Sequence, residues 1–358
     1  MQFNSIQSSL LHFIRFLCSQ AVLIAHLIVL LGWEYRTLIS MASYAVMLFF
    51  ILSGLLITNS LLERRTSDPR YGFSAFFRDR FIRIYPPFLA ALILTFTLDI
   101  VAFEHTEQSY SLKQYFYDLI VNILQLQEFP PAVFLNEHLM IEFFRFRCLG
   151  SNIPLWTIGI EWWIYMFFGF AMFYVIRSTR IRAWQIGVLC CLALPPLYYL
   201  FVSARMENGI TLYWFLGVLI AHAMRKETHT KNSAASLLGL IILAGGLTLF
   251  PKIGYTNSAI LFALGLTLFL NESKKTNEQY PRLKFISSTL AGYSYSLYLI
   301  HYPIIIFIIT LFPAEPDANY FFQIYLSVNI IAFVFAHLFE KNSQKLKQLY
   351  ENYRPHSN

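Results

Sequence analysis

Residues 13–32 read FIRFLCSQAVLIAHLIVLLG, and this run indicates the fold class. Arg15 is its only residue with a full charge at neutral pH, and most of the other side chains are apolar. At about 1.5 Å per residue, a helix of this length crosses the roughly 30 Å hydrocarbon core of a bilayer. The run therefore predicts a transmembrane helix.

Nine further apolar runs follow along the chain, and each is long enough, or nearly so, to cross a bilayer. They lie at residues 41–62, 84–103, 155–176, 185–202, 209–223, 234–250, 257–271, 290–311 and 320–340. The sequence therefore predicts an all-α polytopic bundle of about ten transmembrane helices. We expect one membrane domain over residues 1–340, followed by a short cytoplasmic tail at 341–358.

The composition agrees with a surface that is largely covered by lipid. Of the 358 residues, 57% are hydrophobic and 13% are charged, whereas a soluble chain carries about 25% charged residues. We attribute the net charge of +7 to membrane topology and expect no nucleic-acid partner. The four cysteines fit neither a disulfide framework nor a zinc site, and we expect no metal.

Lysine and arginine are distributed unequally between the two sides of the predicted bundle. If the N-terminus is cytoplasmic, 21 of the 27 Lys and Arg residues lie on the inner side. The positive-inside rule then predicts that both termini are cytoplasmic. The long outer loop 104–153 contains an apolar stretch, 112–127, which predicts an interfacial or re-entrant helix. Its aromatic residues either anchor the loop at the membrane interface or form a lid that stacks on a sugar.

Two ionisable residues of the first span share one helix face. Arg15 and His26 are eleven positions apart, so at about 100° per residue they return to nearly the same face, roughly 16 Å apart. Arg15 lies at the cytoplasmic end and His26 near the middle of the membrane. Ionisable groups within a span are usually functional. The alternatives are a positive-inside anchor for Arg15 and a hydrogen-bonded core histidine for His26.

Two later spans also contain ionisable groups. Glu161 lies one to two turns inside the outer face, where a carboxylate needs a partner or stays protonated. His301 lies near the middle of its span, and we expect Pro303 to break the helix locally and free a carbonyl. Both residues are candidate site residues on the acceptor side, with a buried structural role as the alternative.

Residues 77–87, on the cytoplasmic side, read FRDRFIRIYPP. Arg80 and Arg83 are one helical turn apart and can grip one anionic group, with Arg78 beside them. Guanidinium groups match phosphate oxygens, and topology signalling alone is the alternative. In the second span, Ser53 and Gly54 predict close helix packing, and a serine activated by His26 is the less favoured interpretation.

Together these stretches resemble the integral-membrane acyltransferase family 3, which O-acylates bacterial surface polysaccharides. The matching pieces occur in the family's order: Arg15 with His26, FFILSGLLIT at 49–58, Arg80-x-x-Arg83-Ile-Tyr-Pro-Pro, Trp156-x-x-x-x-Glu161, and Tyr-Ser-Leu-Tyr-Leu-x-His301-x-Pro303. The chain departs from the family pattern after Glu161, where Trp162 and Trp163 replace a common acidic residue and Phe. This departure bears on the choice of acceptor.

The resemblance implies a multi-pass enzyme of the bacterial inner membrane that uses acyl-coenzyme A, most often acetyl-coenzyme A, as co-substrate. It implies a hydroxyl of a cell-surface or lipid-linked glycan as acceptor. Arg15 and His26 are implied to be essential, and Arg80 and Arg83 to contact coenzyme A.

A mechanism follows for these residues. His26 acts as a general base or carries the acyl group as an acyl-imidazole, and Arg15 holds the donor. Glu161 and His301 orient the acceptor hydroxyl, and the acyl group crosses the membrane through the protein. The alternative functions are a proton-coupled transporter or flippase of glycan precursors, and a structural partner in a glycan assembly complex.

Overall fold

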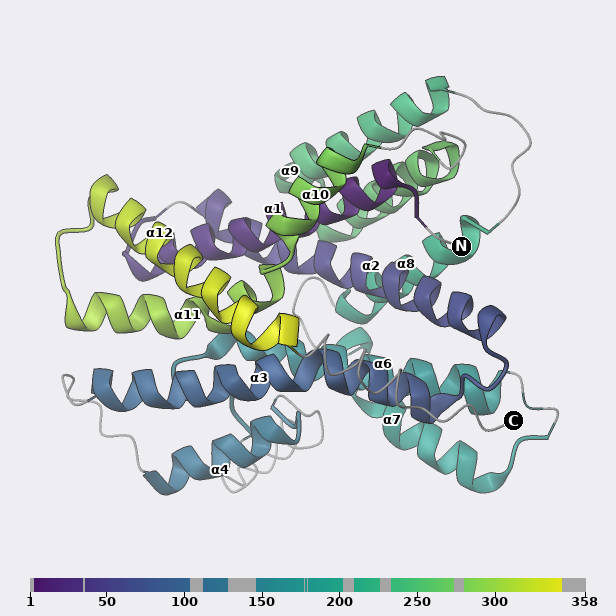
Figure 1. Cartoon of the computed structure of the whole chain (residues 1–358), viewed down its shortest axis with the longest axis horizontal. Helices are drawn as coiled ribbons and strands as arrows, with labels where there is room; N and C mark the ends of the chain where they lie inside the picture. Colours follow the sequence, from purple (N-terminus) through teal and green to yellow (C-terminus); the bar gives the residue numbers. More distant parts are fainter. Residues whose placement is uncertain are drawn as a thin grey trace. The chain divides into compact units, whose positions relative to one another are not determined.

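The computed structural model of the chain describes residues 3–34, 36–103, 112–127, 146–176, 178, 180–201, 209–225, 233–273 and 280–342. Within these ranges the chain is helical and contains no strand, so the predicted all-α bundle is confirmed (Figure 1). The helices are α1 (Ser5–Leu30), α2 (Arg36–Ser67), α3 (Phe73–Phe103), α4 (Leu112–Ile123), α6 (Trp156–Phe170), α7 (Ala183–Phe201), α8 (Ile210–Ala223), α9 (Ser233–Ser273), α10 (Pro281–Ala291), α11 (Ser294–Leu311) and α12 (Ala318–Phe335). Three shorter helical turns accompany them, at Ile153–Leu155 (η2), Ala171–Val175 (η3) and Ala336–Glu340 (η4).

Eight helical segments of the described chain are long and apolar enough to cross a membrane. The expected count of about ten differs from this number at two places. The stretch 209–223 forms α8, which has 14 residues and is shorter than the eight. The stretches 234–250 and 257–271 form the two halves of one element, α9. The cytoplasmic placement of the termini stays a prediction.

Helix α9 consists of two helices joined at Gly254, whose φ of 79° only glycine adopts readily. The two halves run antiparallel with their backbones in close approach. A Cβ atom added to Gly239 would lie 2.7 Å from the backbone nitrogen of Phe269, and one added to Gly265 would lie 2.5 Å from that of Leu243. Small residues permit such approach between membrane helices. The glycines therefore explain why α9 folds back on itself.

The described residues form two compact units. The first unit comprises residues within Met1–Ala25, Tyr35–Tyr71 and Leu197–Ser294, and the second comprises residues within His26–Glu34, Gly72–Pro196 and Tyr295–Asn358. Helix α1 contributes to both units, because the division falls between Ala25 and His26.

Helices α2 and α8 pack closely within the first unit. A Cβ atom added to Gly54 would lie 1.9 Å from the carbonyl oxygen of Trp214, and one added to Gly217 would lie 2.1 Å from that of Ile51. The indole Nε1 of Trp214 donates a hydrogen bond to Ser53 Oγ at 3.2 Å. The close packing predicted at Ser53 and Gly54 is therefore confirmed.

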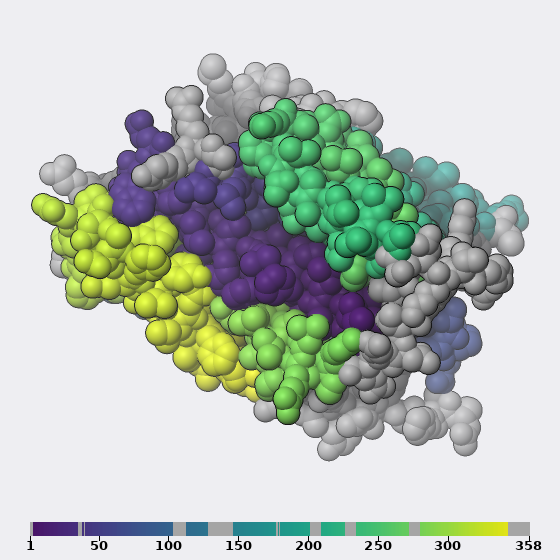
Figure 2. Space-filling view, turned by 90° about the horizontal axis from the view of Figure 1, so that it is seen from above, coloured from purple at the N-terminus to yellow at the C-terminus, as the bar shows by residue number. Residues whose placement is uncertain are grey.

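The first part of α1 is bordered by α9 and α10 in the same unit, and Figure 2 shows it in dark purple between these two green helices. Gln7 Nε2 donates to the carbonyl oxygen of Leu270 at 2.6 Å, and the backbone nitrogen of Tyr280 donates to Ser5 Oγ at 3.2 Å. These bonds tie the start of the chain to the end of α9 and the start of α10.

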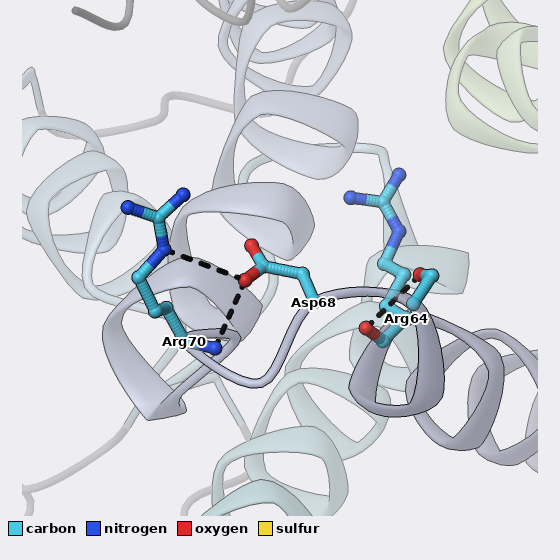
Figure 3. Close-up of polar contacts among 4 residues, drawn as sticks. Arg64, Asp68 and Arg70 are labelled. Atoms are coloured by element: carbon cyan, nitrogen blue, oxygen red, sulfur yellow. Dashed lines mark hydrogen bonds and ion pairs between the residues drawn. The ribbon is translucent and has the colours of Figure 1, made fainter. Parts of the chain in front are cut away.

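A tight turn follows α2 in the segment expected to face the cytoplasm. Asp68 Oδ1 accepts a hydrogen bond from the backbone nitrogen of Arg70 at 2.9 Å and lies 3.7 Å from the Nε atom of the same arginine (Figure 3). The guanidinium of Arg64 lies 5.7 Å from the ring centre of Tyr71. Because Arg70 is largely exposed, this ion pair contributes little to stability.

In the second unit, α4 lies alongside α3 (Figure 1), where the rings of Tyr115 and Phe96 meet edge to face at 5.1 Å. Its outward face is apolar, since Leu112, Phe116 and Ile120 are 63%, 55% and 57% exposed. Its inward face carries buried polar side chains. An apolar face directed outward is typical of a helix that contacts lipid. A helix is confirmed over Leu112–Ile123 of the predicted stretch 112–127, and its interfacial or re-entrant position stays a prediction. The other aromatic residues of the suggested lid, Tyr110, Phe129, Phe134 and Phe143, lie outside the described residues.

Candidate active site

The two histidines predicted to lie near the middle of the membrane are in direct contact in the second unit. His26 of α1 and His301 of α11 are 275 positions apart in the sequence, and His26 Nδ1 lies 2.8 Å from His301 Nε2. Their rings are nearly parallel, at 10°. Tyr302 meets the His26 ring edge to face, with ring centres 5.2 Å apart. The sequence predicted each histidine separately, and the fold pairs them.

The hydrogen bonds determine where each neutral histidine carries its proton. His301 Nδ1 lies 2.9 Å from the carbonyl oxygen of Tyr298 and 3.1 Å from that of Leu297. Carbonyl oxygens only accept, so Nδ1 of His301 carries the proton and its Nε2 is left with a lone pair. His26 must therefore donate from Nδ1. In this arrangement His26 Nε2 has an available lone pair, as a base or nucleophile requires.

The turn of α11 before His301 is held by the start of α6. The hydroxyl of Tyr298 lies 2.7 Å from Thr157 Oγ1 and donates to the carbonyl oxygen of Pro154 at 3.1 Å. Both tyrosine and threonine are buried. The backbone carbonyl that orients His301 thus belongs to a residue whose side chain is itself fixed.

Glu161 lies on α6 one turn after Thr157 and accepts a hydrogen bond from the hydroxyl of Tyr165. The hydroxyl of Tyr295 on α11 donates a hydrogen bond to the carbonyl oxygen of Ile84, the residue after Arg83, at 3.3 Å. The sequence placed Glu161 near the outer face, distant from the arginine cluster. That placement stays a prediction.

Glu340 is a buried carboxylate at the end of the last described span. Its Oε2 accepts a hydrogen bond from Ser296 Oγ at 3.0 Å, and it ends the π-helical turn η4. π-helical turns are rare and often occur at functional sites. Through Ser296, Glu340 of η4 is tied to α11 five residues before His301.

The three candidate arginines of α3 differ in their surroundings. Arg80 is 7% exposed, and its guanidinium carbon lies 5.8 Å from the ring centre of Phe76. Arg78 is half-buried and Arg83 is exposed. Of the three, Arg83 is therefore the most accessible to a soluble anion. Arg15 belongs to the first unit and lies half-buried on α1, eleven positions before His26.

A buried polar layer lies beneath α4. Asp99 accepts hydrogen bonds from the Tyr115 hydroxyl at 2.7 Å and from the backbone nitrogen and Oγ of Ser151 at 2.9 and 2.6 Å. Burial raises the pKa of Asp118 on α4 to about 6, although a hydrogen bond from Gln114 and the charge of Arg147 act in the opposite direction. This layer joins α4, the end of α3 and the residues before α6.

Helix α11 continues through Pro303 without interruption, so the local helix break predicted there is wrong. Tyr298, Thr157 and Glu340 were not among the site residues predicted from the sequence. Tyr298 belongs to the stretch that resembles the family motif, but no pattern in the sequence linked it to Thr157. Within the described residues, no group of three or more His, Cys, Asp or Glu side chains is arranged to hold a metal ion.

One comparison with known proteins bears on these residues. A family model described as an acyltransferase domain matches residues 10–339. This range includes both histidines, all three arginines of α3 and Glu161. No curated protein and no solved structure matches the chain.

Proposed function

The chain belongs to acyltransferase family 3, and from this premise we propose that it transfers an acyl group from acyl-coenzyme A to a hydroxyl of a cell-surface or lipid-linked glycan. We place the reaction in the bacterial inner membrane and expect acetyl as the acyl group. The observation that carries the proposal is the 2.8 Å contact between His26 and His301, which leaves His26 Nε2 as an available base.

The reaction begins when His26 Nε2 takes the proton of the acceptor hydroxyl. The oxygen then attacks the thioester carbonyl, and the new carbon–oxygen bond forms as the carbon–sulfur bond breaks. The departing thiolate takes the proton back from His26, so no net charge remains on the protein. During the step the His26 imidazolium still donates from Nδ1 to His301 Nε2, which stabilises its positive charge.

A covalent route uses the same geometry. In this route His26 Nε2 attacks the thioester, the carbon–sulfur bond breaks and coenzyme A leaves as the thiolate, which gives an acyl-imidazolium that still donates from Nδ1 to His301. The acceptor oxygen then takes the acyl group, the neutral imidazole is restored, and the hydroxyl proton is released to water, where it balances the thiolate. An acyl group that is carried on His26 can travel from a cytoplasmic donor to an acceptor on the outer side. Both routes require the lone pair of Nε2.

The donor is a cytoplasmic polyanion, and a basic surface attracts it. Arg83 is exposed and Arg78 is half-buried, so both are placed to contact its phosphates, whereas Arg80 is buried against Phe76. Arg15 remains a candidate for the donor's pyrophosphate or pantetheine. Glu161 accepts a hydrogen bond from Tyr165 and remains the candidate for orienting the acceptor hydroxyl.

The proposal is tested with purified protein in lipid nanodiscs, acyl-coenzyme A and a glycan acceptor. His26→Ala should lower acyl transfer by about 10²- to 10⁴-fold, the usual cost of losing a general base. His12→Ala is the matched control, because His12 lies on the same helix and outside the pair. Undiminished transfer by the His26→Ala variant would contradict the mechanism, and glycan movement without release of free thiol would favour the transporter or flippase.

Sidedness is tested in sealed inside-out vesicles that contain the acceptor. Acyl-coenzyme A added to the bath should label glycan in the lumen if the acyl group crosses the membrane through the protein. Labelled glycan in the bath alone would place the whole reaction on the cytoplasmic side.

A further inference from the structure

Pro303 leaves one carbonyl of α11 without its helical partner. In a regular helix the carbonyl oxygen of residue 299 accepts a hydrogen bond from the backbone nitrogen of residue 303. Proline has no N–H group, so Leu299 loses this donor although the helix continues. The carbonyl of Leu299 lies within a predicted membrane span, where water does not readily supply the missing hydrogen bond.

The side chain of Asn152 supplies the missing donor. Its Nδ2 atom lies 2.9 Å from the carbonyl oxygen of Leu299 and 3.0 Å from Thr95 Oγ1. A carbonyl only accepts, so the amide nitrogen must face Leu299. Asn152 is completely buried and lies just before Ile153–Leu155, the turn that opens α6. It thereby connects three segments of the second unit.

The contact lies next to the acceptors that fix His301. The carbonyl oxygens of Leu297 and Tyr298 accept the hydrogen bond from His301 Nδ1, and Leu299 is the next residue along the helix. Asn152 and Pro154 together hold two consecutive residues of this turn, Leu299 through its carbonyl and Tyr298 through its hydroxyl. A shift of this turn would move His301, and with it the partner of His26.

We propose that Asn152 is a positioning residue, whose amide replaces the N–H missing at Pro303 and fixes the turn of α11 from which His301 holds His26. The effect on catalysis rests on the proposed acyl transfer, whereas the contact itself does not. Without the amide, the unpaired carbonyl at a proline favours a kink in the helix. The two histidines would then lose their alignment while the rest of the bundle stays folded.

The test is a double-mutant cycle between Asn152 and Pro303. Asn152→Ala in the otherwise unchanged chain should lower kcat for acyl transfer by about 10- to 100-fold, since small misplacements of catalytic groups have effects of this size. In a Pro303→Ala background the chain regains the N–H for Leu299. There the same Asn152→Ala change should lower kcat by less than about threefold, because the carbonyl no longer needs the amide.

Three measurements accompany the cycle. KM for acyl-coenzyme A should change little in any member of the cycle. The acidic limb of the pH profile of kcat should move only when Asn152→Ala is made in the chain that keeps Pro303. A mere loss of folded protein would not move this limb. Thr95→Val is the matched control, because it removes the other acceptor of the Asn152 amide and leaves Leu299 paired. Thermal unfolding of the four cycle members in detergent tests the contact without any activity.

The outcomes separate the two proposals. If the wild-type protein transfers no acyl group, the proposed function fails, and the unfolding cycle alone decides the role of Asn152. An equal effect of Asn152→Ala on kcat and on unfolding in both backgrounds would overturn the inference, as would the absence of any effect. A loss of stability that depends on Pro303 but leaves kcat and its pH profile unchanged would also overturn the positioning role.

Discussion

Replacement of His301 tests the tautomer assignment at the centre of the proposed site. His301→Leu removes the acceptor that lies 2.8 Å from His26 Nδ1. A buried donor left without a partner costs about 1–3 kcal/mol, and His26 then gains from placing its proton on Nε2 instead. At about 1.4 kcal/mol per factor of ten, this corresponds to a fall in kcat of roughly 5- to 100-fold. We expect the fall to appear in kcat rather than in KM for acyl-coenzyme A.

His301→Gln separates orientation from bulk. A glutamine carbonyl oxygen accepts a hydrogen bond from His26 Nδ1, so this variant should keep kcat within about tenfold of wild type, above the leucine variant. The assay is release of free thiol from acyl-coenzyme A in nanodiscs, with unfolding temperature measured for each variant. His222→Leu on α8 is the control, because His222 is exposed and outside the pair. Equal losses for leucine and glutamine, or wild-type rates for both, would refute the tautomer assignment.

Three further predictions concern the donor contact, the packing of α2 against α8 and the buried layer beneath α4. Arg83→Ala should raise KM for acyl-coenzyme A by roughly 10- to 100-fold with partial rescue by lysine, and Arg80→Ala should mainly lower the yield of folded protein; equal KM values for the Arg83 variant and wild type would make that residue a topology signal. Gly217→Ala should lower the unfolding temperature, since the new Cβ atom would lie 2.1 Å from the carbonyl oxygen of Ile51. Gly245→Ala is the control, because the space around Gly245 is open. An equal fall in unfolding temperature for both variants would argue against close packing. The pKa of Asp118 is raised from 3.8 to about 6, so its contribution to stability is fully present below about pH 4 and is lost as the pH rises through 6. Hydrogen exchange of α4 should therefore quicken over this range in the wild type. The same pH dependence in the Asp118→Asn variant would contradict the assignment.

The sequence by itself determined the class of the fold. Long apolar runs with few charges leave lipid as the only solvent in which the chain can be stable, and helices satisfy the backbone there. The same runs identified His26, His301 and Glu161 as candidate site residues, because each is an ionisable residue in an otherwise apolar segment. Hydropathy did not determine the number of spans, since the kink at Gly254 and the 14-residue helix α8 are defined by backbone geometry.

Only the tertiary structure decided which of these residues meet. His26 and His301 are separated by 275 positions, and no periodicity of either helix encodes the contact between them. The exposure of Arg83 and the burial of Arg80, one turn apart on α3, depend on neighbouring side chains rather than on spacing. The sequence also showed that Pro303 deprives a carbonyl of its partner. That Asn152 fills this place follows from how the start of α6 packs against α11, because a side-chain donor reaches a backbone acceptor only when the fold brings both to within 3 Å.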